Sequence, residues 1–175
     1  MRGVNMYQKI KFGSLALALY ILSISIFALP SDREQTLHIF ANSSFFNYKT
    51  GIDIYEGDVK VDQGSTHLTG DRLITKKNAK RKIISAIAYG IKKRAIFKTE
   101  PKSGDKPLIA MAKIIKLYPE TSLVMLEEDV NVAQGENSFH GPIIIYNMKD
   151  QVVSIPPSKN GRATIIINPK PLKSP

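Results

Sequence analysis

The side chains that could perform acid–base or metal chemistry are few and far apart in this 175-residue chain. The histidines are His38, His67 and His140, and none stands at ligand spacing from another histidine or from a carboxylate. Three carboxylates follow one another at residues 127–129, but they fall at an expected bend, where water solvates charge. The chain has no cysteine and no nucleophile-elbow, zincin or P-loop motif. We therefore expect no catalysis, no metal site and no cofactor.

Basic residues are concentrated at residues 76–82 and 92–94, in a chain whose formal net charge is +10. These runs either form a solvated surface or attract an anion, such as phosphate or an anionic lipid head group. No aromatic residue interrupts them, as a base-stacking platform would require. Together with the leader sequence described next, this argues against nucleic acid as a partner.

The segment 1–28 has the pattern of a secretory signal peptide. Arg2, Lys9 and Lys11 precede an apolar run at residues 15–28, which ends in a small residue. The run is short for a membrane span, which needs about 20 apolar residues. We expect cleavage after Ala28, and an uncleaved anchor is the alternative.

The elements that must position the remaining side chains come from a unit that occurs twice. Asp58 aligns with Asp129 and Gly70 aligns with Gly141, at the same offset and without a gap between the two pairs. We call this constant offset the repeat spacing. Such self-similarity indicates one structural unit used more than once. The rest of the chain precedes, connects or follows the two copies.

Each copy predicts short strands with a bend between them. Apolar and polar residues alternate over residues 52–54 and again over 59–61, which is the pattern of a strand with one buried face. The parity slips at residues 56–58, and the second copy slips at 127–129, so we expect a bulge or corner at both places. Gly64 and its counterpart Gly135 permit the tight reversals that follow.

Along the mature chain, turn signals separate about sixteen short antiparallel strands, which predicts an all-β sandwich, barrel or jelly roll. Residues 108–118 could form a helix by propensity, but the repeat aligns them with the strand that opens the unit. We expect one domain at residues 29–168, after the signal peptide at 1–28. Residues 169–175, rich in proline and lysine, are expected to be a flexible tail.

Several of these segments, taken in order, resemble the LptA (OstA-like) family of periplasmic lipopolysaccharide transport proteins. The resemblance covers residues 37–168, and the segments that carry it are the leader, Leu37-His38-Ile39, residues 54–64, Ala88-Tyr89-Gly90, residues 94–97 and the second copy of the repeat. One departure is Glu128, which stands where the family usually has glycine.

The resemblance implies an open, twisted β-jelly roll whose interior holds the acyl chains of lipid A. It also implies a periplasmic location and head-to-tail self-association. Its members bridge the inner membrane to the outer membrane by adding edge strands to LptC and LptD. In this chain the apolar strand at residues 163–167 and the first strand at 37–40 would be the edges that pair.

Strand parity places eight apolar side chains on candidate inward faces, where lipid would bind. They are Leu37, Ile39, Ile52, Ile54, Phe97, Leu117, Leu123 and Met125. Two other hypotheses stay open: a membrane-anchored LptC-like relative, which would keep its leader, and a lipid-free periplasmic scaffold with a dry core.

Overall fold

The structure, a computed structural model, describes residues 32–101, 104–158 and 161–168. The predicted signal peptide at 1–28 and the predicted tail at 169–175 lie outside these residues. The described part forms one twelve-stranded antiparallel sheet, preceded by a short 3-10 helix, η1 (Asp32–Glu34). Among the described residues, no helix is both long and apolar enough to cross a membrane.

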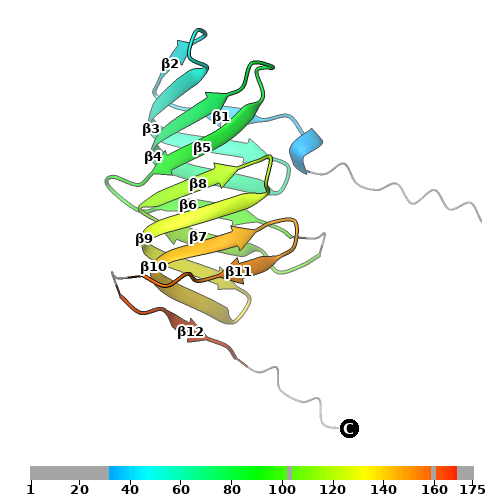
Figure 1. Cartoon of the computed structure of the whole chain (residues 1–175), viewed down its shortest axis with the longest axis vertical. Coiled ribbons are helices and arrows are strands. Elements are labelled where there is room, and N and C mark those ends of the chain that lie inside the picture. Colours follow the sequence, from blue (N-terminus) through cyan, green and yellow to red (C-terminus); the bar gives the residue numbers. More distant parts are fainter. Residues whose placement is uncertain (1–31, 102–103, 159–160, 169–175) are drawn as a thin grey trace, which may run out of the picture. The chain divides into compact units, whose positions relative to one another are not determined.

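The strands are stacked along the long axis of Figure 1 from the first part of the chain to the last, although neighbours in the sheet are not always consecutive in the chain. They are β1 (His38–Phe40), β2 (Ser43–Asn47), β3 (Ile52–Gln63), β4 (Thr66–Lys77), β5 (Ile83–Tyr89), β6 (Ala95–Thr99), β7 (Leu108–Ala112), β8 (Ile114–Tyr118), β9 (Leu123–Gln134), β10 (Asn137–Asn147), β11 (Val152–Ser154) and β12 (Thr164–Ile166). The all-β class is confirmed. Fewer strands appear than the predicted sixteen because β3, β4, β9 and β10 each run unbroken through the bend. Residues 108–118 form β7 and β8 rather than a helix.

The bend lies where the parity slip predicted it. The pairing of β3 with β4 shifts between Glu56 and Val59, and that of β9 with β10 shifts between Gly141 and Ile143. The backbone is left-handed at the extra residues of both long strands, with φ of 80° at Gly57 and 61° at Glu128. Glutamate therefore adopts at the second bend the conformation that glycine adopts at the first.

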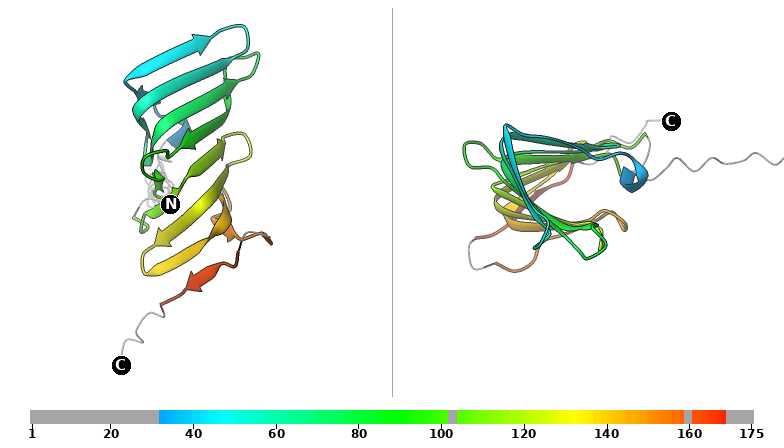
Figure 2. Two further views of the ribbon diagram at one scale, coloured as in Figure 1. Left: turned by 90° about the vertical axis from the view of Figure 1, so that its left-hand side faces the viewer. Right: turned by 90° about the horizontal axis from the view of Figure 1, so that it is seen from above.

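The bend folds the sheet into two halves that share β3, β4, β9 and β10. One half adds β2, β5, β8 and β11 to these strands, and the other adds β1, β6, β7 and β12. Figure 2, in its right-hand view, shows the two halves diverging from the bend. The apolar faces of the halves meet in one hydrophobic core.

The repeat is visible in the backbone. β3 and β9 have the same length, and their first and last residues correspond at the repeat spacing. The amide of Lys77 donates to the carbonyl of Gly51 at 2.7 Å, and the corresponding amide of Met148 donates to Ser122 at 2.8 Å. The two copies thus share hydrogen bonds as well as sequence.

The interior between the halves is densely filled. The largest fully buried apolar side chains are Phe97, Leu73, Leu108, Ile115, Leu126, Ile144, Val124 and Val132. Each contributes about 1.5–3 kcal/mol by leaving water, so this interior is the main source of stability.

Candidate functional site

The interior face of one half carries an unbroken apolar row from the first strand to the last. Residues opposite one another in antiparallel strands point to the same face, so the row follows from the strand registers. We call it the long row: Ile39, Val61, Leu68, Phe97, Ala110, Val132, Phe139 and Ile165. It crosses eight strands and runs from the edge strand β1 to the edge strand β12.

The other half presents a second apolar row to the same core. We call it the short row: Tyr55, Leu73, Ala88, Ile115, Leu126 and Ile144. Members of both rows belong to one contiguous core. The interior is therefore an apolar track, perpendicular to the strands, with one wall from each half.

The track is closed at its centre and open at its ends. Phe97 and Val132 have no exposed surface, whereas Ile165, the last residue of the long row, is 55% exposed. At the other end Phe46, which lies opposite Asp53 and contacts the Tyr55 ring edge-on at 5.8 Å, is also exposed. Apolar surface is thus available to a ligand where the track ends.

Three of the eight predicted lipid-binding residues lie on this interior face. Ile39 and Phe97 belong to the long row, and Leu117 stands opposite Ala86 and Val124 and packs against the core. Leu37 precedes β1 and is exposed.

The inward orientation expected for Ile52, Ile54, Leu123 and Met125 is wrong. Ile54 lies opposite Ile74 and Met125 opposite Ile145, on the outer face of the sheet. The interior positions belong to their neighbours, which are buried: Asp53 and Tyr55 in β3, and Val124 and Leu126 in β9. The faces could not be assigned from the alternation of apolar and polar residues, for two reasons. Residues 123–126 are apolar on both faces, and the first interior residue of β3 is charged.

Most residues of the long row were not predicted from the sequence, although many of them occupy matching apolar positions in the two copies of the repeat. At the repeat spacing, Val61 corresponds to Val132, Leu68 to Phe139, and Ile39 to Ala110. Each pair holds an apolar residue at the same place in both copies. Beyond the bend, positions that are apolar in both copies identify the interior face. Before the bend the same rule selects Ile54 and Met125, which lie on the outer face.

The charged groups form pairs rather than a catalytic constellation. Lys116 donates to Glu127 at 2.6 Å, which raises the pKa of the lysine, and the 2.6 Å hydrogen bond between His67 and Asp62 lowers the pKa of the Asp62 carboxyl. Within the part of the chain that the structure describes, no group of three or more His, Asp or Glu side chains could hold a metal ion.

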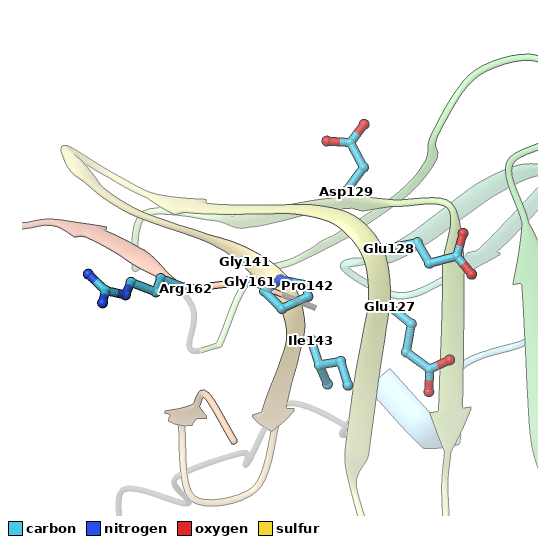
Figure 3. Close-up of a pocket in the computed structure, with 8 residues that line it drawn as sticks. All are labelled: Glu127, Glu128, Asp129, Gly141, Pro142, Ile143, Gly161 and Arg162. Atoms are coloured by element: carbon cyan, nitrogen blue, oxygen red, sulfur yellow. The ribbon is translucent and has the colours of Figure 1, made fainter. Parts of the chain in front are cut away.

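The carboxylates at the second bend line a hollow of about 520 Å³ together with Arg162. Figure 3 shows that Glu127 and Glu128 point to one side of the bend while Asp129 points away from both. Asp129 lies 3.5 Å from Arg94, on the surface. These carboxylates do not converge on a common point, as paired acid–base catalysts would.

Taken together, the bent sheet, the doubled unit and the apolar track define a class of protein: an open β-jelly roll with an apolar interior and unpaired edge strands at both ends of the described sheet. The model of the family described as LptA/(LptD N-terminal domain) LPS transport protein matches residues 38–152. The chain belongs to this family.

Known members are similar over most of their length. Lipopolysaccharide export system protein LptH of Pseudomonas aeruginosa is 33% identical over 148 residues, covering 82% of this chain and 79% of LptH. Lipopolysaccharide export system protein LptA of Escherichia coli K12 is 25% identical over 160 residues, covering 91% of this chain and 85% of LptA.

The fold also agrees with a solved structure. The crystal structure of LptH, the LptA homologous periplasmic component of the conserved lipopolysaccharide transport device from Pseudomonas aeruginosa, superposes with a TM-score of 0.72 at 29% identity. The match covers 80% of this chain and 100% of that one.

Proposed function

We propose that this chain is a periplasmic carrier that holds the acyl chains of lipopolysaccharide along the apolar track, as one part of a bridge from the inner to the outer membrane. The observation that carries the proposal is the long row, which is apolar in all eight strands that it crosses. An ordinary core needs burial, but it does not need a row that continues to both edges. A lipid passed from one protein to the next does need one.

Within the track, Ile39, Phe97 and Leu117 are the predicted lipid contacts that the interior face retains. Phe97 has no exposed surface, so lipid reaches it only when the two halves spread about the bend. Closely packed interiors resist partial opening, and entry at the ends of the track is therefore the first step of loading.

The partners follow from the edges of the sheet. β12 pairs only with β10, and β1 only with β3, among the described strands. The edge strand β12 exposes apolar side chains on both of its faces, Ile165 and Ile166, which is the kind of edge that another strand covers. We propose that β12 and β1 join chains head to tail and that the same edges add strands to LptC and LptD.

The protein performs no catalysis in this proposal. It supplies an apolar path, and the energy for transport is released elsewhere. The names of the similar proteins describe export components, which agrees with this role.

A lipid-free scaffold is the second candidate, and the closed centre of the core favours it. Mass spectrometry of the full chain purified from its native envelope, intact and after solvent extraction, separates the two. Co-purified lipopolysaccharide on a chain that begins at Leu29 is the expected result. Lipid on a chain that keeps its leader would indicate the membrane-anchored alternative. A chain that carries no lipid and binds none when lipopolysaccharide is added would leave only the scaffold.

A further inference from the structure

A polar hollow of about 320 Å³ adjoins the start of the short row. It lies between the turn that joins β2 to β3 and the turn that joins β4 to β5. Three cationic side chains, Lys49, Lys77 and Arg81, line it together with a single carboxylate, Asp53. Its net charge is therefore positive, and it has the donors that a phosphate group requires.

Asp53 and Lys77 form an ion pair within this hollow. The Asp53 side chain is 3% exposed, and the Lys77 side chain is 29% exposed. A buried carboxylate is costly unless it is paired, so Asp53 holds the ammonium of Lys77 at the inner end of the hollow. The Lys77 side chain lines the hollow and keeps part of its surface exposed, so an anion in the hollow can approach it.

The outer wall of the hollow is held by the two turns. The side-chain oxygen of Asn47 accepts hydrogen bonds from the amides of Lys49 and Thr50, at 3.0 and 3.1 Å. The guanidinium of Arg81 lies 5.8 Å from the centre of the Tyr48 ring, which links one turn to the other. The turn that carries Lys49 and the guanidinium of Arg81 are therefore positioned by the fold before any ligand arrives.

The second copy of the repeat offers an internal comparison. At the repeat spacing, Val124 replaces Asp53 and Met148 replaces Lys77. The backbone hydrogen bond of Lys77 to Gly51 has its counterpart in that of Met148 to Ser122, so the frame is the same. Val124 is fully buried and Met148 packs against the core. The frame therefore folds without the ion pair, and the charged pair in the first copy requires an explanation other than stability.

We infer that the hollow of the first copy is a phosphate site, in which Lys49, Lys77 and Arg81 bind a phosphate monoester of a lipid whose acyl chains lie along the short row. Asp53 stands two residues before Tyr55 on the same face of β3, about 7 Å along the strand. A head group in the hollow thus places its acyl chains at the first residue of the row. Because only one copy carries the charges, the site gives the lipid a single orientation in the track. This inference rests on the proposed function.

The test compares the full chain with a double variant, Asp53→Val/Lys77→Met, which copies the residues of the second repeat. Removing both charges leaves neither partner of the ion pair buried alone, so folding is retained. The matched control is Lys149→Met, which removes one exposed lysine from a turn in the second copy. The probes are lipid A carrying its phosphates, the same lipid A after enzymatic dephosphorylation, and inorganic phosphate. Native mass spectrometry measures the bound fraction of each.

We expect the unaltered chain and Lys149→Met to prefer the phosphorylated lipid by about tenfold, the effect of one or two charge-assisted hydrogen bonds. The double variant should bind both lipids equally, with the affinity that the unaltered chain has for the dephosphorylated form. Arg81→Met, which leaves the interior untouched, should reduce the preference in part. An excess of inorganic phosphate should remove the preference of the unaltered chain but not its binding of the dephosphorylated lipid.

Each other outcome is decisive. A double variant that still prefers the phosphorylated lipid overturns the site, and so does inorganic phosphate that displaces the dephosphorylated lipid. An unaltered chain that binds both lipids equally also overturns the site but leaves the carrier proposal standing. An unaltered chain that binds neither lipid overturns the carrier proposal, and the phosphate site falls with it.

Discussion

Ile39 and Phe40 are neighbours in β1 whose side chains lie on opposite faces of the sheet. Ile39 begins the long row and is half-buried, whereas Phe40 lies opposite Lys60 on the outer face and is 56% exposed. Phe97, in the middle of the row, is a poorer place for a charge, because burying an unpaired carboxylate in a closed core costs several kcal/mol and would unfold the protein. The neighbours in β1 therefore allow the interior face to be tested without loss of the fold.

We predict that Ile39→Asp lowers lipopolysaccharide loading by about tenfold or more, since a charge at the mouth of the track must be desolvated before acyl chains can enter. Phe40→Asp places the same charge on the same strand, one residue away and on the other face, and should load normally. Lipid bound per protein, with circular dichroism to confirm the β content, is the measurement. Equal loading by the two variants would contradict the assignment of the interior face.

At the scale of elements, the bends were predictable and the faces were not. Both bends followed from a parity slip at the same place in two copies, because a single extra residue in a strand shifts every later side chain to the other face. The face of the first part of β3 was mispredicted because Asp53 is buried with Lys77 as its partner, and this pairing depends on a contact between strands. In β9, Leu123 and Val124 are both apolar, so alternation carries no information there.

The two bends differ in the side chains that they tolerate at the left-handed residue. A Cβ added at Gly57 would lie 2.6 Å from the side-chain nitrogen of Asn42, and the backbone there has a positive φ. Glu128 holds a similar left-handed conformation with an exposed side chain. We predict that Gly57→Ala lowers the free energy of unfolding by more than about 1 kcal/mol and that Glu128→Gly raises it by about 0.5–1 kcal/mol. Urea unfolding of the two variants measures both changes, and a loss of stability in Glu128→Gly would show that its side chain has a structural role.

The helix η1 is attached to the β3–β4 turn through one carboxylate. Asp32 accepts hydrogen bonds from the amide and hydroxyl of Ser65, at 3.0 and 2.7 Å, and from the hydroxyl of Thr66. Burial alone would raise the pKa of Asp32, but these hydrogen bonds outweigh burial and hold the pKa below its ordinary value of 3.8. The ionised carboxylate is therefore the form that attaches the helix.

Because the pKa is lower in the folded chain, the stabilisation by Asp32 is complete above pH 3.8 and is lost as the pH falls through the folded value. We predict that the Ser65 amide exchanges its hydrogen slowly above pH 3.8, relative to its intrinsic rate, and loses this protection at lower pH. Asp32→Ala should remove the protection at every pH. Protection in Asp32→Ala equal to that of the unaltered chain would mean that the helix is held by other contacts.

At the scale of the whole domain, the sheet has no closed ends. The strand order runs from β1 and β2 to β11 and β12 without a barrel seam among the described strands, so backbone donors and acceptors remain at both ends. The long row reaches the same two ends. An assembly that pairs β12 of one chain with β1 of the next would therefore continue the sheet and the apolar track at once.

Continuing the sheet and continuing the track therefore depend on the same residues at the junction. The Ile165 side chain ends the long row and is exposed, so Ile165→Lys should place a charge in the junction between two chains and shift the protein towards monomer. Ile91→Lys is the control, because Ile91 is 73% exposed in the loop between β5 and β6, away from either end of the sheet. Sedimentation velocity over a range of concentrations should give oligomers that grow with concentration for the unaltered chain and for Ile91→Lys, with about tenfold weaker association for Ile165→Lys.

A heterologous contact of this kind does not close on itself, so the oligomers should form a series rather than stop at a dimer. A dimer that does not grow, or an Ile165→Lys variant that associates normally, would place the junction elsewhere and separate the assembly from the track.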